Sequence, residues 1–194
     1  MSFGGSASDI MDAAVARLLS VGGSVVVAAG NEAGDACRGS PARAAGTLSV
    51  GATALDDSVA PFSNTGPCVS LYAPGTAAPC AGHNSDTSVQ ALSGTSMASP
   101  LVAGTAALYL QANPGSSVGE VRQGVLCGAT ANGVSGAPRG SSSLMVYTQP
   151  SAGFPGPEEV TQCGISGAAG AGAAGRALAL ALALALALLP ALAA

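Results

Sequence analysis

Leu92-Ser93-Gly94-Thr95-Ser96-Met97-Ala98-Ser99-Pro100 joins a turn of small residues to an apolar run over residues 102–110. The run predicts a buried helix that begins near Ser96. A serine at the start of a helix lies where backbone N–H groups are unpaired and the helix dipole is positive. That environment suits an oxygen nucleophile whose product carries negative charge. Thr95 or Ser96 could equally be only the N-cap of the helix, so this stretch leaves both interpretations open.

A second informative stretch, Ser24-Val25-Val26-Val27-Ala28-Ala29-Gly30-Asn31, is a β-branched run that ends in Gly-Asn. It predicts a buried strand of a parallel sheet, with Asn31 at the carboxyl end where open α/β sheets place their chemistry. An asparagine there could be a turn residue, or it could point its amide N–H at an oxyanion.

Together the two stretches resemble the subtilisin-like serine proteases (subtilases), in particular the proteinase K and aqualysin branch. Residues 94–100 match the nucleophile motif of that family letter for letter, and residues 28–31 match its oxyanion-hole strand. The resemblance runs from about residue 2 to about residue 148. Further landmarks follow in family order: Ser2-Phe3-Gly4-Gly5, Ser40-Pro41-Ala42-Arg43, Val50-Gly51-Ala52, Phe62-Ser63-Asn64 and Leu71-Tyr72-Ala73-Pro74-Gly75.

The resemblance implies a three-layer α/β fold with a mostly parallel sheet and a serine endopeptidase that hydrolyses peptide bonds in proteins. Ser96 would attack the scissile carbonyl, and Asn31 would donate its side-chain N–H to the oxyanion together with the backbone N–H of Ser96. Two sets of residues would bind the substrate: Ser2, Phe3, Gly4 and Gly5 as an added strand, and Ala28, Ala29 and Gly30 as the pocket for the side chain before the cleaved bond.

The chain departs from the family in its catalytic base. In subtilases the Asp and His of the triad precede the substrate-binding strand, and this chain starts at that strand, so both are absent and the fold and its core should be incomplete. His83 does not match the catalytic His motif and is expected to be a solvated loop residue. Leu101 stands where the family usually has a His that is not a triad member. We therefore expect the chain alone not to cleave peptides. The alternative function is a non-catalytic, subtilase-like peptide-binding module.

The two ends suggest a piece of a secreted protein. Met1 precedes what looks like the inside of a strand, and no signal peptide is recognisable, which makes Met1 an internal methionine by hypothesis. We expect three regions: the C-terminal part of the catalytic domain (residues 1–149), a Pro/Gly/Ala-rich linker (150–176) and an apolar tail (177–194). The tail fits a signal for a GPI anchor, a membrane helix or a low-complexity end without a role. The expected location is extracellular or at the cell surface.

The five cysteines favour an oxidising compartment. Cys37 and Cys68 match a pair that is bridged in the aqualysin-like branch, so the resemblance predicts this disulfide, with free buried thiols as the alternative. Cys80, Cys127 and Cys163 cannot all pair internally.

No cofactor, metal or nucleic acid is predicted. The proteinase K branch often binds Ca²⁺ through backbone carbonyls and one Asp, but Ser70 stands at the Asp position, and the loss of this charge should weaken the site. The chain has no CxxC pair that would suggest zinc, and its net charge of −4 comes without a basic cluster. The expected partners are protein or peptide substrates, with membrane attachment through the tail.

Local signals predict the remaining elements. A helix is expected over Asp9–Ser20 with Ser8 as its N-cap, a strand over residues 47–52 and a short strand over residues 68–72. Residues 76–91 should form a polar loop. Ser117-Val118-Gly119-Glu120 is a capping box that begins a helix running to about Leu126. Residues 144–148 could be a last strand or a core contact.

Overall fold

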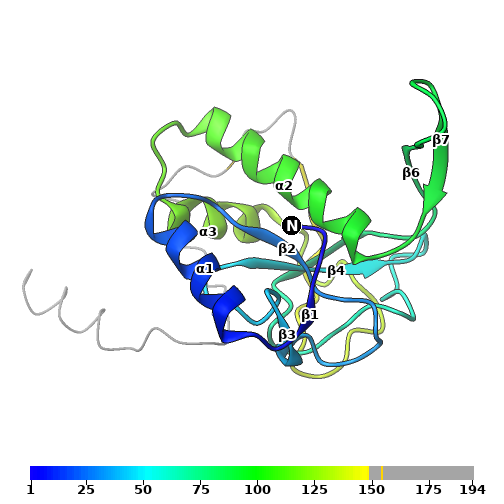
Figure 1. Ribbon diagram of the computed structural model, residues 1–194, viewed down its shortest axis with the longest axis horizontal. Coiled ribbons are helices and arrows are strands. Elements are labelled where there is room, and N and C mark those ends of the chain that lie inside the picture. The colour runs from blue at the N-terminus through cyan, green and yellow to red at the C-terminus, as the bar shows by residue number, and fades with distance from the viewer. Residues whose placement is uncertain (149–153, 155–194) are drawn as a thin grey trace, which may run out of the picture.

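A computed structural model describes residues 1–148 and 154, and its body is a parallel sheet packed between helices (Figure 1). The sheet has three strands in the order β2, β4, β5: Val26–Ala28, Leu48–Thr53 and Leu71–Pro74. Val26 lies opposite Leu48, and Val50 lies opposite Leu71. Every residue of these three strands except Pro74 is buried, as expected for a parallel sheet that is covered on both faces.

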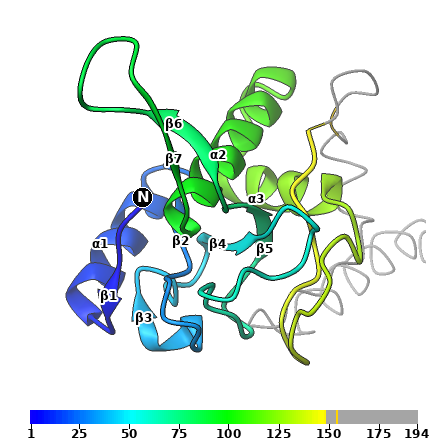
Figure 2. The same cartoon turned by 90° about the vertical axis from the view of Figure 1, so that its right-hand side faces the viewer.

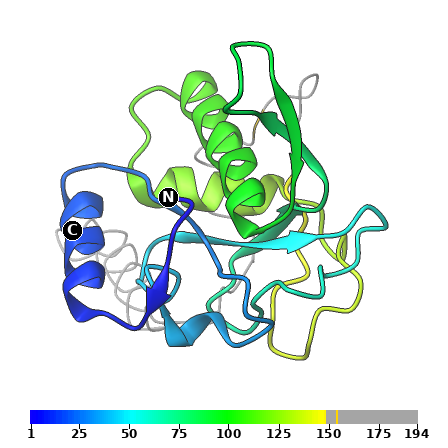
Figure 3. The same ribbon diagram turned by 45° about the vertical axis from the view of Figure 1, so that its right-hand side comes forward.

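Helices cover both faces of the sheet (Figure 3). On one face, α2 (Thr95–Ala112) and α3 (Val118–Gly128) share a core with alternate strand residues such as Val50 and Leu71. On the other face, Val15 and Leu19 of α1 (Asp9–Ser20) pack against Val25 and Val27. The α/β fold and these three helices are therefore as the sequence predicted.

The predicted helix caps are present. The Ser8 hydroxyl accepts a hydrogen bond from the backbone N–H of Met11 at 3.4 Å. Ser117 and Glu120 form the reciprocal capping box at the start of α3. The first turn of α1 is also tied to the neighbouring loop, because Arg43 forms ion pairs with Asp9 and Asp12. These helix starts could be predicted from sequence because each cap forms its hydrogen bonds with residues within one turn of the same helix.

Two predictions about strands need correction. The expected polar loop over residues 76–91 contains an antiparallel hairpin of β6 (Ala78–Ala81) and β7 (Val89–Leu92), which projects from the body of the molecule (Figure 2). Its strands contact mainly each other, so they lack the buried β-branched pattern by which a core strand is recognised. The strand expected over residues 68–72 begins at Leu71, since Val69 is buried but does not pair with β4.

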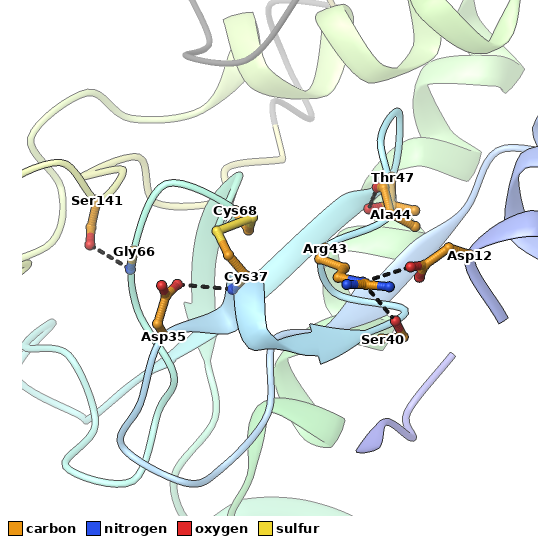
Figure 4. The surroundings of a disulfide bond; sticks show 10 residues. All are labelled: Asp12, Asp35, Cys37, Ser40, Arg43, Ala44, Thr47, Gly66, Cys68 and Ser141. Carbon is orange, nitrogen blue, oxygen red and sulfur yellow. Dashed lines mark hydrogen bonds and ion pairs between the residues drawn. A yellow bond between two sulfur atoms is a disulfide. The ribbon is translucent and has the colours of Figure 1, made fainter. Parts of the chain in front are cut away.

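The loop between β2 and β4 is cross-linked to the segment before β5 (Figure 4). A short 3₁₀ helix, η1 (Ala36–Arg38), carries Cys37, whose sulfur bonds to Cys68 with the Cα atoms 5.2 Å apart. The Asp35 carboxylate caps η1 by accepting from the Cys37 N–H at 2.9 Å. This is the pairing that the resemblance implied, and Cys80 is the free thiol among the described residues.

The segment just before Thr148 packs on the core of the described fold. Leu144 and Val146 pack on the core, and Met145 forms bridges to Tyr72 and Thr130, so this segment makes core contacts as well as isolated strand pairing. The linker from residue 150 and the apolar tail over residues 177–194, with its predicted anchor, lie outside the described residues apart from Phe154. Within residues 1–148, no helix has the length and apolar character needed to cross a membrane.

Candidate active site

A cavity of about 640 Å³ opens where the N-terminal segment, the end of β2 and the start of α2 meet. Its lining includes three segments that are distant in sequence, namely residues 2–6, residues 28–32 and the pair Thr95 and Ser96, together with Asn64 and parts of the loop over residues 34–42. β1 (Gly5–Ser6) is held there by antiparallel pairing with β3 (Gly39–Ser40). The cavity therefore brings together all the residues that the sequence assigned to catalysis and substrate binding.

Ser96 lies in the first turn of α2, and it is not the N-cap. Gly94 occupies the cap position without any side-chain bond, so the cap interpretation of Thr95 or Ser96 is wrong. The half-buried Ser96 hydroxyl donates to the backbone carbonyl of Ser2 at 3.0 Å. In return, the Ser2 hydroxyl donates to the Ser96 carbonyl at 3.0 Å. That carbonyl needs an outside donor because Pro100, four residues on, has no N–H.

The orientation of the Asn31 amide is fixed by Thr95. The Asn31 oxygen accepts from the Thr95 backbone N–H at 2.8 Å and from the Thr95 hydroxyl at 2.9 Å. The Thr95 hydroxyl in turn accepts from the Gly30 N–H at 3.2 Å. The Asn31 amide nitrogen is thereby left without an acceptor among the described residues, and so is the backbone N–H of Ser96 in the first helical turn. Two unpaired N–H donors thus belong to residues that line one cavity.

Asn64 is a residue of the site whose role the sequence did not reveal. Its buried amide oxygen accepts from the N–H groups of Glu32 and Gly34, and its nitrogen donates to the Ala29 carbonyl at 3.0 Å. The same nitrogen donates to the Glu32 carboxylate at 2.7 Å. Gly30 makes this packing feasible, because its φ is +104° and a Cβ there would lie 2.3 Å from the Asn64 nitrogen. The landmark Phe62-Ser63-Asn64 was the available signal, but only the fold shows what Asn64 holds.

No imidazole faces Ser96 in the described structure. His83 is exposed in the loop between β6 and β7 and does not line the cavity. The carboxylates that do line it, Glu32 and Asp35, accept from Asn64 and from the Cys37 N–H. The Ser96 hydroxyl therefore has a neutral carbonyl as its acceptor, and a carbonyl cannot take its proton at neutral pH.

The residues at the calcium position implied by the resemblance do not fit Ca²⁺. The Thr47 carbonyl, just before β4, accepts from the Arg122 guanidinium at 3.3 Å and from the Ser70 hydroxyl at 3.5 Å. Burial lowers the pKa of Arg122, but arginine stays charged in proteins. A cation on this carbonyl and a hydroxyl in place of a carboxylate both disfavour a second, divalent cation.

A serine in the first turn of a helix and an asparagine just after a parallel strand line one cavity, an arrangement that is typical of α/β serine peptidases. The model of the subtilase family, peptidase family S8, matches residues 1–145. The chain belongs to the subtilase family.

Similar proteins agree with this assignment. The chain is 47% identical over 148 residues to the extracellular serine proteinase of Thermus sp. (strain Rt41A). This alignment covers 76% of the chain and 36% of the relative. It is 48% identical over 116 residues to cerevisin of Saccharomyces cerevisiae, covering 60% of this chain and 18% of cerevisin. The crystal structure of a cold-adapted subtilisin-like serine proteinase superposes with a TM-score of 0.74 at 42% identity, covering 78% of this chain and 54% of that one. The chain thus spans about a third of the Thermus relative and about half of the solved structure.

Proposed function

We propose that this chain carries the nucleophile, the oxyanion hole and one wall of the substrate cleft of a subtilisin-like serine endopeptidase. The observation that carries the proposal is the fixed Asn31 amide, whose oxygen is held by Thr95 and whose nitrogen has no acceptor among the described residues. A donor held in this way is ready to stabilise negative charge without reorganising.

The proposed chemistry follows from these positions. As the Ser96 oxygen bonds to the substrate carbonyl carbon, the electron pair of the C=O bond moves to the carbonyl oxygen. That oxyanion accepts from the Asn31 amide and from the Ser96 backbone N–H. Ser2, Phe3, Gly4 and Gly5 would pair with the substrate backbone, and Ala28, Ala29 and Gly30 would line the pocket for the side chain before the cleaved bond, because all of them line the same cavity. The hydroxyl proton needs a base, which the described residues do not supply, so we expect the purified chain alone not to hydrolyse casein.

The test is binding of a peptide boronic acid, followed by titration and ¹¹B NMR. A nucleophilic Ser96 should add to the trigonal boron, release its proton to solvent and give the signal of a tetrahedral boronate. Asn31→Asp keeps the oxygen that Thr95 holds and removes the N–H donor. We expect this variant to weaken boronate binding by about 10²-fold or more, in line with the loss of one oxyanion donor, for which a subtilisin is the reference case.

Ser96→Ala and an unreactive peptide amide are the controls. Ser96→Ala should abolish the tetrahedral signal and leave binding of the peptide amide unchanged. If the chain is instead a non-catalytic peptide-binding module, the boronate and the amide will bind equally well and neither substitution will matter. That result would overturn the endopeptidase proposal.

We infer an extracellular site of action. The Thermus relative is named an extracellular proteinase, and the chain holds a disulfide between Cys37 and Cys68, which persists in oxidising compartments. Attachment to a membrane through residues 177–194 stays a prediction. Treating cells that display the protein with phosphatidylinositol-specific phospholipase C tests the GPI form of it: release supports an anchor, and retention contradicts it.

A further inference from the structure

The loop that carries Asn31 is held by one neighbouring segment of the chain. We call residues 29–34 the Asn31 loop. Three backbone hydrogen bonds of 2.9 Å join this loop to residues 62–65, at Gly30, Ala33 and Gly34. Asn31 contributes none of them, because neither its N–H nor its carbonyl has a hydrogen-bond partner among the described residues. The position of the Asn31 backbone is therefore set by the residues on either side of it.

The Asn64 side chain uses all of its hydrogen-bonding capacity on the Asn31 loop. A side-chain amide offers two N–H donors and an oxygen with two lone pairs. The two donors bond to the Ala29 carbonyl and to the Glu32 carboxylate, at 3.0 and 2.7 Å. The oxygen accepts from the N–H groups of Glu32 and Gly34, at 3.1 and 2.9 Å. A flipped amide would place its NH₂ group against two N–H donors, so these partners fix the orientation of a side chain that is only 6% exposed.

The Asn31 loop needs this support because its backbone is strained. Gly30 has a φ of +104° and Ala33 has a φ of +51°, so residues in the left-handed region lie on both sides of Asn31. An alanine in that region crowds its Cβ against the backbone, and such a conformation persists only where the surrounding structure imposes it. We therefore expect the Asn31 loop to relax to another conformation when the bonds from Asn64 are lost.

We propose that Asn64 is a positioning residue of the active site, which determines where the Asn31 amide lies. Thr95 fixes the rotation of this amide through its bonds to the amide oxygen, and Asn64 fixes the backbone from which the amide projects. An oxyanion donor is effective only if it is already in place when the charge develops, so displacement of the loop weakens the donor without removing it. The inference rests on the proposed function, because it concerns the same oxyanion donor.

The test compares binding of the peptide boronic acid with binding of the unreactive peptide amide to the full chain. Asn64→Ala removes all four side-chain bonds, and the isosteric Asn64→Asp keeps the acceptor oxygen and removes both donors. Each variant should weaken boronate binding by about 10- to 100-fold and change amide binding by less than about 3-fold, because only the boronate adduct uses the oxyanion donor. Asn113→Asp is the matched control. It makes the same change in an amide that donates to the Tyr109 carbonyl at the far end of α2, and it should leave both affinities unchanged.

A double-mutant cycle separates positioning from a purely structural role. In the Asn31→Asp background the donor is already absent, so Asn64→Asp should weaken boronate binding no further. Additive losses would mean that Asn64 acts on the fold in general, and they would overturn the inference. Unchanged boronate binding in Asn64→Asp would overturn it as well. Circular dichroism shows whether each variant is folded, and Asn64→Asp serves alone if Asn64→Ala does not fold.

The ¹H–¹⁵N NMR signals of the Asn31 side-chain amide test the positioning without any ligand. In the unbound chain these signals should shift in Asn64→Asp and stay in place in Asn113→Asp. If the wild type forms no tetrahedral boronate, the proposed function fails, while a shift of the Asn31 signals in Asn64→Asp would still support the positioning of the amide. Identical Asn31 signals in the wild type and in Asn64→Asp would overturn the positioning whether or not the boronate binds.

Discussion

Both sides of α2 carry mostly uncharged, apolar residues, but their surroundings are very different. The inner side is closed by the sheet and by α3, and Val102 and Tyr109 are fully buried there. The outer side carries Leu101 and Leu108, which are nearly half exposed. The helix is equally apolar around its circumference, so its hydrophobicity alone does not show which residues stabilise the fold. Only the neighbours of each side chain decide whether it contributes to stability or forms a surface that a partner can cover.

The largest effect that tests this comparison is expected at adjacent residues of α2. Tyr109→Ala should lower the free energy of unfolding by about 3–5 kcal/mol, because it removes a fully buried aromatic ring that packs against α3. Leu108→Ala, one residue away and 45% exposed, should cost less than about 1 kcal/mol. Urea unfolding followed by circular dichroism gives both values. Equal losses would mean that the outer side of α2 is already covered, and the comparison would fail.

The second prediction compares the stability contributed by the loop that the Cys37–Cys68 disulfide cross-links with that of the projecting β6–β7 hairpin. Replacing both Cys37 and Cys68 by Ser should cost about 2–4 kcal/mol, since the bridge joins residues 31 apart and restrains the unfolded chain. Cys80→Ser in β6 removes a free, half-buried thiol and should change stability by less than about 0.5 kcal/mol. The same unfolding assay serves for both variants. A larger loss at Cys80 would show that the hairpin is packed against something else.

The smallest expected effect is the pH dependence of the unfolding free energy that the buried Tyr72 contributes. Burial raises the pKa of Tyr72 on β5, whose side chain is fully buried in a cluster with Ala29, Ala36, Ala42, Val69 and Val134. The folded state therefore favours the neutral phenol. Its contribution to stability is complete below the unfolded pKa of about 10 and is lost as the pH rises through the higher folded value.

Tyr72→Phe should consequently flatten the alkaline limb of a plot of unfolding free energy against pH between about 9 and 11. Tyr147→Phe, at a half-exposed position, should leave that limb unchanged. An identical slope in the wild type and in Tyr72→Phe would contradict the prediction.

Much of the fold could be predicted because its signals are local. Ser8 and the pair Ser117 and Glu120 mark helix starts within four residues, and the β-branched run of β2 marks a buried strand. The β6–β7 hairpin was missed because its strands bury little and alternate weakly. The start of β5 was misplaced because Val69 is apolar and buried without taking part in the sheet.

The candidate site divides in the same way. Ser96 and Asn31 were identified by a resemblance carried in short, specific motifs. The contacts that orient them were not identified: Thr95 on the Asn31 oxygen, Asn64 on the loop after Gly30, and Ser2 on the Ser96 carbonyl. The last pair of residues is separated by 94 positions, and no pattern in the sequence connects them.

The sequence by itself predicted the family, the helices and most of the strands, the candidate serine and asparagine, and the pairing of Cys37 with Cys68, because short motifs and turn-length periodicities carry that information. Tertiary structure alone decided that segments distant in sequence line one cavity and that, among the described residues, the Asn31 nitrogen has no acceptor and one side of α2 is exposed. Those properties depend on which surfaces meet across the fold, and contact between surfaces follows from packing in three dimensions rather than from the order of residues along the chain.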